Sequence, residues 1–345
     1  MASATYKQAG VDIDAMERAI ALFEPAVKAT HGPQVLAGLS DFGGMFALDK
    51  AAYEEPVLVS GTDSVGTKVK IAFALDRHDT IGQDAVAMCA DDVVTLGARP
   101  LFFLDYIGCH SVVPEVIAAV VEGVAKGCEL AGCALIGGEI AELSDMYQPG
   151  EYDLVGFCVG VVDRAKITDG SRTQEGDVVV GIASSGLHSN GFTLVRKVLL
   201  ERARLALDRE IPELGRTLGD ELLEPTRIYA AALQPVFGRY EVRGAAHITQ
   251  GGVPGNLGRV IPSHLSAHVD ASAWPRPPIF DLVQRMGDVA DAEMVRVFNL
   301  GLGMVLVAPR DQAEGIVSDL ASAGQEAYVV GEIVRREGDE AVVMR

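Results

Sequence analysis

Residues 58–68 read LVSGTDSVGTK. Their first residues belong to an apolar stretch, PVLVS, which predicts a buried strand. The strand leads into a loop of Gly, Ser and Thr that carries Asp63 and Lys68. Such a loop is suited to hold a metal ion and a phosphate together, because Mg²⁺ prefers oxygen ligands and backbone N–H groups with a lysine bind phosphate oxygens. Since the GxxxxGK[ST] spacing of a P-loop is absent, the stretch predicts ATP chemistry on another scaffold.

The composition indicates a two-domain protein outside nucleic-acid and membrane-surface classes. The chain has 345 residues, 49% of them hydrophobic, and single cores tend to split above roughly 250–300 residues. Its net charge of −19 argues against general binding to nucleic acid or anionic membranes. The N-terminus lacks the pattern of a signal peptide, and no apolar run approaches the ~18 residues of a membrane span. Five irregularly spaced cysteines suit reduced, buried thiols, so we expect a cytoplasmic protein.

Outward from the opening strand, helical and strand patterns mix along the chain. Asp12 can cap a helix over 12–30, in which Pro25 is expected to kink or end the helix, and the Gly-containing stretch 31–48 is expected to be a loop. The turn-rich segment 163–177 is the best candidate for a domain boundary, and Ser189 or Asn190 can cap a helix that begins at 192. Further helices are expected at 80–96, 114–131 and 311–323, and strands at 101–107, 134–139, 152–162, 178–184, 298–308 and 327–334. The pattern predicts an α/β (α+β-like) fold with domains 1–166 and 167–345.

Three separate segments place acidic residues after strands or on a helix face. Asp63 follows the first strand, Asp91 and Asp92 lie in CADDVV, and Glu139 ends ALIGGE. Hard oxygen ligands of this kind are what Mg²⁺–ATP requires. The competing interpretation is that each acid is a solvated surface residue.

Two histidines and a lysine are the other candidates for chemistry. His188 lies in a turn between a strand and a helix start, which suits an anion site or a general acid or base, and His247 precedes a Gly-rich turn in the same way. Lys68 can neutralise phosphate charge. An exposed surface position is the alternative for all three. A Rossmann site and a serine hydrolase are set aside, because GxGxxG and G-x-S-x-G are both absent.

Taken together, these segments resemble the phosphoribosylformylglycinamidine cyclo-ligase (aminoimidazole ribonucleotide synthetase) family over nearly the whole chain. The resemblance rests on YKQAGVDID, LVSGTDSVGTK, HDTIGQDAVAMCADDVV, PLFFLDYI, IGGEIAE, EYDLVGFCVGVV, SSGLHSNG, LLEPTRIY, GNLGRVIP and FNLGLGM, in that order. It implies ATP-dependent closure of the imidazole ring of formylglycinamidine ribonucleotide in de novo purine (IMP) biosynthesis, with phosphoryl transfer activating the formyl oxygen. It also implies a homodimer whose N-terminal mixed sheets pair into a barrel. The site would lie in a cleft beside that interface, between the two domains, with the ATP and Mg²⁺ site in the N-terminal domain and the substrate cleft in the C-terminal domain.

The resemblance also implies a role for each residue that matches a family motif. His188, Asp92 and Lys68 would be catalytic, and the metal ligands would be Asp63 and Asp92 first, with Asp91 and Glu139 second. The remaining positions are expected to bind ATP (Gly43, Gly44, Ser60, Gly61, Thr62, Asp63, Gly66, Thr67, Lys68, Gly137, Gly138) or formylglycinamidine ribonucleotide (His188, Ser189, Asn190, Gly191, His247, Thr249). The 36–44 loop would cover the nucleotide.

The chain departs from the family pattern at four places near this site. Ser64 stands where the pattern has Gly, Ile140 where it has Thr, and Gln250 where it has the first Gly of a turn, while 37–41 has fewer glycines than usual. Ser64 is tolerable only where the backbone does not need a positive φ. Two alternatives therefore stay open: a catalytically impaired, nucleotide-binding paralogue that acts as a partner protein, and another ATP-using synthetase or kinase of the superfamily.

Overall fold

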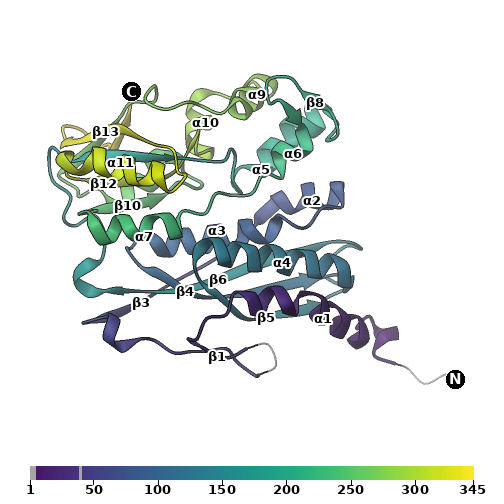
Figure 1. Ribbon diagram of the computed structural model, residues 1–345. Helices are drawn as coiled ribbons and strands as arrows, with labels where there is room; N and C mark the ends of the chain where they lie inside the picture. Colours follow the sequence, from purple (N-terminus) through teal and green to yellow (C-terminus); the bar gives the residue numbers. More distant parts are fainter. Residues whose placement is uncertain (1–4, 39–40) are drawn as a thin grey trace.

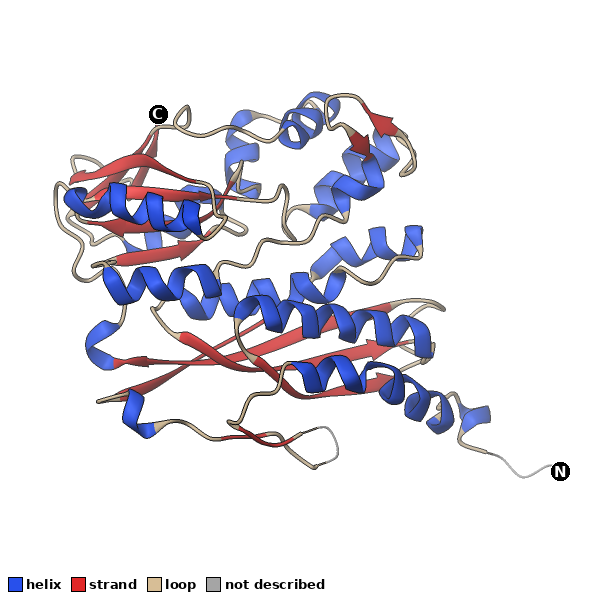
Figure 2. Cartoon of the chain, in the orientation of Figure 1, coloured by secondary structure: helices blue, strands red, loops and turns tan. Residues whose placement is uncertain are grey.

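The computed structural model describes residues 5–38 and 41–345 and contains two main sheets, each flanked by helices (Figures 1 and 2). The predicted mixed α/β class is confirmed. The helices are α1 (Ile13–Ala29), α2 (Val69–Leu75), α3 (Ile81–Val94), α4 (Pro114–Ala131), α5 (Phe192–Val195), α6 (Leu218–Leu222), α7 (Ala230–Arg239), α8 (Gly252–Leu257), α9 (Pro278–Gly287), α10 (Asp291–Val297) and α11 (Ala313–Ser322). The strands are β1 (Val35–Ala37), β2 (Met45–Phe46), β3 (Pro56–Ser64), β4 (Arg99–Cys109), β5 (Ala134–Glu142), β6 (Tyr152–Asp163), β7 (Val178–Ala183), β8 (Glu210–Ile211), β9 (Arg216–Thr217), β10 (Gly244–His247), β11 (Leu265–Val269), β12 (Leu302–Ala308), β13 (Ala327–Arg335) and β14 (Val342–Met344).

The N-terminal sheet has the strand order β3-β6-β4-β5. β6 is antiparallel to both β3 and β4, whereas β4 and β5 are parallel and are joined through α4. Helices α1, α3 and α4 lie on one side of this sheet. Of these, α3 and α4 lie between the sheet and the C-terminal half (Figure 1). Exposed and half-buried residues alternate along β3 as far as Thr62, as expected for a strand with one covered face. The prediction that PVLVS is a buried strand is wrong, because none of its residues is fully buried.

The opening stretch forms a longer strand than its sequence predicts. The prediction that a loop begins after Ser60 is wrong, because β3 continues to Ser64 and pairs with β6 throughout. Gly61 is needed inside the strand because a Cβ there would lie 3.2 Å from the Cys89 carbonyl oxygen of α3. The strand therefore presents Asp63 from a rigid element that packs directly against α3.

The first helix begins where its sequence predicts and continues past its proline. The Asp12 carboxylate accepts a hydrogen bond from the Ala15 N–H at 3.3 Å, which confirms the predicted N-cap. The expectation that Pro25 would end the helix is wrong, since α1 extends to Ala29. The stretch expected to be a plain loop contains the short β1–β2 pair, and residues 39 and 40 of the expected nucleotide-covering loop lie outside the described residues.

The C-terminal half is built on a six-stranded sheet with the order β10-β12-β7-β13-β11-β14. The prediction that Ser189 or Asn190 caps the helix after β7 is wrong: Gly191 occupies the N-cap with φ +77° and no side chain caps the helix. A π-helical segment, Arg196–Arg202, continues it. No helix in the described part of the chain is long and apolar enough to cross a membrane.

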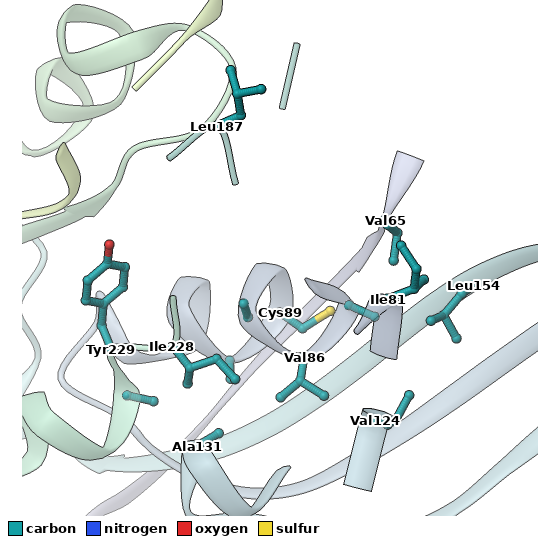
Figure 3. Packing of buried hydrophobic residues seen from close by; sticks show 14 of the residues in the cluster. Val65, Ile81, Val86, Cys89, Val124, Ala131, Leu154, Leu187, Ile228 and Tyr229 are labelled. Atoms are coloured by element: carbon teal, nitrogen blue, oxygen red, sulfur yellow. The ribbon is translucent and has the colours of Figure 1, made fainter. Parts of the chain in front are cut away.

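Helix α3 lies between the two halves and contacts both the N-terminal sheet and the C-terminal half. Its buried residues Val86 and Cys89 lie near Ile228 and Tyr229 of the C-terminal half, within one hydrophobic cluster (Figure 3). The same helix packs on β3, β4 and β6 below it. Residues on α3 are therefore placed where chemistry from both halves meets.

Candidate functional site

Two carboxylates and a histidine from three elements meet at the junction of the two halves. Asp63 comes from β3, Asp92 from α3 and His247 from the end of β10. His247 Nδ1 lies 2.9 Å from Asp92 Oδ1, and the two groups form an ion pair across the junction when the imidazole is protonated. The sequence predicted that Asp63 and Asp92 belong to one site, and the structure brings them together.

The charges in this group shift one another's protonation. Burial raises the pKa of Asp63, and the neighbouring Asp92 charge raises it further. Burial by itself would lower the pKa of His247, but the hydrogen bond with Asp92 and the charges of Asp91, Asp92 and Asp63 raise it above its ordinary value. The raised pKa of Asp63 means that its charged form is disfavoured here, and a cation bound beside it would favour that form.

Asp91, next to Asp92, faces the C-terminal half, where one of its two carboxylate oxygens binds a helix start. Its Oδ1 accepts hydrogen bonds from the backbone N–H groups of Tyr229 (2.9 Å) and Ala230 (3.0 Å), at the N-terminus of α7. Burial raises the pKa of Asp91 to about 7. The interaction with the helix start explains an acid at this position without a metal ion.

Lys68 is buried in an ion pair rather than exposed to a nucleotide. Its ammonium donates to Asp84 Oδ1 at 2.8 Å and to the Glu224 carbonyl oxygen at 2.6 Å, and both Lys68 and Asp84 are fully buried. Asp84 Oδ1 also accepts from the N–H (2.8 Å) and hydroxyl (2.6 Å) of Thr226. Two of the three N–H donors of the ammonium are thus used within the protein, and the side chain is fully buried.

His188 is buried, and its backbone has a conformation that is uncommon for residues other than glycine. Its φ is +62°, in the left-handed region. The ring Nε2 accepts a hydrogen bond from the Ser185 N–H at 3.2 Å, which assigns the proton of the neutral ring to Nδ1. Burial, followed by the charges of His247, Lys68 and Arg227, lowers the pKa of His188 well below its ordinary value. The ring is therefore neutral at pH 7 and can donate a hydrogen bond from Nδ1.

Five buried polar atoms around this junction have no hydrogen-bond partner among the residues that the structure describes. They are Asp84 Oδ2, Asp91 Oδ2, His188 Nδ1, Ser189 Oγ and His247 Nε2. Leaving a buried polar group unpaired costs about 1–3 kcal/mol. A polar ligand, or water that such a ligand displaces, would satisfy these atoms, so the concentration of free donors and acceptors marks the junction as the candidate site.

Glu139 does not join this group within one chain. It pairs with Tyr106 of β4, which pairs with Val155 of β6, which pairs with Ser64 of β3. Three strand spacings of about 4.8 Å separate it from the Asp63 edge. The predicted four-carboxylate ligand set is thus not assembled, and the described residues contain no group of three or more His, Cys, Asp or Glu side chains placed to hold a metal ion.

Glu139, Gly137 and Gly138 instead line a second pocket, of about 310 Å³, between α1, α4 and β5. Gly138 leaves room for a neighbour, because a Cβ there would lie 2.1 Å from Asp105 Oδ1. Gly44 packs against the same strand, because a Cβ there would lie 2.7 Å from Ile136, the residue before Gly137, whereas Gly43 has open space. The predicted nucleotide-binding glycines are thus divided between the two edges of the sheet.

The other predicted contacts lie near the junction, and several already have partners within the protein. Thr62 Oγ1 donates to the Gly156 carbonyl oxygen at 2.8 Å, and Thr67 Oγ1 lies 3.0 Å from Thr193 Oγ1 across the two halves. Asn190 Nδ2 contacts Met88 Sδ at 3.8 Å, and Thr249 Oγ1 contacts Asn256 Oδ1 at 3.5 Å. Ser60 faces the uncovered side of β3, Gly66 has φ +70°, and a Cβ at Gly191 would lie 2.3 Å from Phe298.

Two of the departures from the family pattern are compatible with the backbone. Neither Ser64 nor Gln250 is among the non-glycine residues with positive φ that the structure records; the turn after Gln250 places this demand on Gly251 and Gly252. Ile140 is half-buried and lines the pocket beside Glu139. Ile140 therefore places an apolar side chain in the wall of this pocket, where the family pattern has a hydroxyl, and the departure at 37–41 includes residues 39 and 40, outside the described residues.

Sequence reasoning missed Asp84 and Thr226 as residues of the junction. The seven-residue spacing of Asp84 and Asp91 on α3 shows that both face one way, but nothing local reveals that this direction is toward the other half. Only the Lys68 and Thr226 contacts identify Asp84 as the buried partner.

Comparisons with known proteins cover both halves of the chain. Family models for the AIR synthase related protein match residues 48–162 (N-terminal domain) and 174–344 (C-terminal domain). The predicted boundary at 166/167 stays a prediction. A phosphoribosylformylglycinamidine cyclo-ligase of Anaeromyxobacter dehalogenans is 56% identical over 333 residues (96% of each chain), and that of Desulfitobacterium hafniense is 53% identical over 329 residues (95% of this chain, 96% of the relative).

Solved structures share the fold at low sequence identity. Thiamine-monophosphate kinase from Stenotrophomonas maltophilia matches with a TM-score of 0.69 and 19% identity, over 94% of this chain and 95% of that one. Hydrogenase maturation protein HypE in complex with ATP matches with a TM-score of 0.65 and 16% identity, over 95% and 90%. These two show the fold, and the identity to the curated relatives shows that this chain belongs to the phosphoribosylformylglycinamidine cyclo-ligase family.

Proposed function

We propose that this protein closes the imidazole ring of formylglycinamidine ribonucleotide, using ATP, to give 5-aminoimidazole ribonucleotide, ADP and phosphate in de novo purine biosynthesis. The observation that carries the proposal is identity of 50–56% to relatives named as this cyclo-ligase, over at least 95% of the chain. The junction supplies the groups that such a phosphoryl transfer needs, namely adjacent carboxylates and a neutral buried hydrogen-bond donor. A cytoplasmic location is part of the same proposal.

Asp63 and Asp92 are the proposed carboxylates for Mg²⁺ bound to ATP. Mg²⁺ is often held by one or two carboxylates together with phosphate oxygens and water, so two neighbouring acids are sufficient. Burial, and to a lesser extent the charge of Asp92, raises the pKa of Asp63, and a divalent cation between the two carboxylates would favour their charged forms. The ion would shield the charge of the transferred phosphoryl group.

His188 is proposed as a hydrogen-bond donor to the substrate rather than as a base. Its Nε2 is occupied by the Ser185 N–H, and its Nδ1 has no partner and is buried. With the pKa of the ring well below its ordinary value, Nδ1–H can donate to a substrate oxygen without the ring becoming charged. Ser189, whose hydroxyl also lacks a partner, is proposed as a second substrate contact.

The uncovered face of the N-terminal sheet supports the proposed homodimer. Leu58, Tyr106 and Phe157 on β3, β4 and β6 are 65%, 37% and 38% exposed. Large apolar side chains gathered on one sheet face are typical of protein interaction sites. A second copy that covers this face would bury them.

The direct test is a turnover assay on the purified chain with ATP, MgCl₂ and formylglycinamidine ribonucleotide. We expect ADP and 5-aminoimidazole ribonucleotide in equal amounts, and no ADP when either Mg²⁺ or the ribonucleotide is omitted. Asp92→Asn should abolish most of the turnover, whereas Asp208→Asn, a matched change on the exposed surface, should not. Folded protein that releases no ADP under these conditions would overturn the proposal.

A further inference from the structure

A further pocket, different from the one lined by Glu139, lies between the two halves and away from the candidate active site. It has a volume of about 330 Å³ and is lined by the start of β4, by the connector after β6 and by α7. Arg99, in its wall, pairs with Val161, which pairs with Leu58 of β3. Leu58 precedes Asp63 by five residues, or about 16 Å of strand. The pocket is thus near the opposite end of the sheet from Asp63.

Three basic side chains line this pocket, one from the start of β4 and two from the connector after β6, in a chain whose net charge is −19. Arg99 donates through Nε to the Tyr53 hydroxyl at 3.3 Å, and Arg172 reaches only two backbone carbonyl oxygens, at 3.4 and 3.5 Å. Lys166 lies 3.9 Å from Asp163. Within residues 5–38 and 41–345, neither arginine has a carboxylate within 4.0 Å, so each guanidinium group keeps its other N–H donors for an anion.

The two acidic residues in the pocket wall have partners of their own. Asp163 Oδ1 accepts hydrogen bonds from the N–H groups of Glu54 (2.8 Å) and Glu55 (3.1 Å). Glu241 accepts from Arg243 Nε at 3.1 Å, and this contact lowers the pKa of Glu241. Both carboxylates therefore have hydrogen-bond partners other than Arg99 and Arg172, although the charge of Arg172 also contributes to the lowered pKa of Glu241.

Aromatic side chains complete the lining. Tyr53, Phe237 and Tyr240 contribute to the wall. Flat apolar surface beside guanidinium groups suits a ligand that has both a ring and a phosphate, because arginine binds phosphate through paired N–H donors. The volume lies at the lower end of the ~300–1,000 Å³ range of small-molecule sites, which matches one mononucleotide and excludes a polymer.

We propose that this pocket binds a phosphate monoester of mononucleotide size, with Arg99 and Arg172 on the phosphate and the aromatic wall on the ring. The ligand would touch both halves, which are joined here by a hydrogen bond from Gln234 Nε2 of α7 to the Ala98 carbonyl oxygen at 3.1 Å. It is therefore an effector site: occupancy stabilises the arrangement of the two halves that also builds the active site. The proposal does not depend on the proposed activity.

The test is calorimetric titration of AMP into the full chain saturated with a non-hydrolysable ATP analogue, so that the nucleotide site is filled first. Ribose 5-phosphate, inorganic phosphate and adenosine are titrated in parallel. We expect AMP to bind and adenosine to fail. AMP binding more tightly than ribose 5-phosphate assigns the natural ligand to nucleotides, and equal binding assigns it to sugar phosphates. Binding of neither phosphate ester overturns the proposal.

Variants connect the binding to the arginines. Arg99→Glu with Arg172→Glu should weaken AMP at least about tenfold, given ~1.5–3 kcal/mol for a hydrogen bond to a charged group. Arg209→Glu, at an exposed arginine outside the pocket, should leave the affinity unchanged. Arg99→Gln and Arg172→Gln are gentler changes if the double reversal fails to fold. Unchanged AMP affinity in folded Arg99 and Arg172 variants would also reject the site.

Discussion

His188 combines a left-handed backbone with an unpartnered ring nitrogen. Strained conformations persist where the surrounding structure requires them, and often at functional sites. His188→Asn separates the two features, because Asn tolerates this φ but lacks the imidazole. We expect turnover to fall about 10²-fold while the melting temperature changes little.

The control for this variant is Arg204→Asn. It introduces Asn at another residue with positive φ (+52°), which follows the π-helical segment after α5. It should leave turnover unchanged. A large loss of thermal stability in His188→Asn, equal in proportion to the loss of activity, would instead assign His188 a structural role.

Asp91 makes stability depend on pH in a direction opposite to that of most surface acids. Its folded-state pKa of about 7 lies above the ordinary value of 3.8. A raised pKa contributes stability that is present below pH ~4 and is lost as pH rises to about 7. Asp91→Asn keeps an acceptor for the Tyr229 and Ala230 N–H groups and removes the buried charge, so it should stabilise the protein by a few kcal/mol at pH 7.5.

Urea unfolding at pH 4.5, 6 and 7.5 measures this difference. The gain of Asp91→Asn over the parent should grow between the first and last pH and stay level above pH 8. A gain that is independent of pH, or a loss at pH 7.5, would show that the Asp91 carboxylate is stabilised in the folded state by a positive partner such as His247.

At the scale of single elements, α3 connects the two halves through Asp84 and Asp91, which lie two turns apart and bind Thr226 and Tyr229 of the C-terminal half. Lys68 and Asp84 form a fully buried pair, and breaking such a pair by removing one partner costs about 3–5 kcal/mol. Asp84→Asn keeps an acceptor for the Thr226 N–H but leaves the ammonium unpaired. We expect Asp84→Asn and Lys68→Met each to be strongly destabilising, and the double variant to be more stable than either.

A double-mutant cycle in urea gives the coupling free energy, and ATP titration of the double variant tests the predicted phosphate contact. If Lys68 is only a structural residue, the neutral double variant binds ATP as the parent does. A marked loss of ATP affinity in a stable double variant would restore the prediction that Lys68 reaches a phosphate.

Local sequence patterns predicted the elements better than they predicted their partners. The predicted helix at 114–131 matches α4, and the prediction for 80–96 matches α3 within two residues at each end, because caps and apolar periodicity are local. Asp63, Asp92 and His247 were each chosen from local context, and two of them were assigned to one metal site. The meeting of Asp92 with His247, 155 residues apart, and the separation of Glu139 from Asp63 depend on strand order, which no local signal contains.

For the whole molecule, the uncovered sheet face is the feature that one chain leaves unexplained. Phe157 pairs with Thr62 on one side and Leu104 on the other, in the middle of this face. A stable dimer needs about 800 Å² of buried surface per partner, and a four-stranded sheet face provides an area of that order. We therefore expect the parent protein to sediment as a dimer at micromolar concentration, and Phe157→Glu to sediment as a monomer with unchanged secondary structure.

Val329→Glu is the matched control, since Val329 is also a partly exposed apolar strand residue (46%) but lies in the C-terminal half; it should stay dimeric. If the two sheets close into a barrel, edge strands β3 and β5 of one copy lie against edge strands of the other. These edges carry Asp63 and Glu139, so turnover of Phe157→Glu should fall together with the dimer. A parent protein that sediments as a monomer at tens of micromolar, or a monomeric Phe157→Glu with full turnover, would contradict an active site that depends on the second copy.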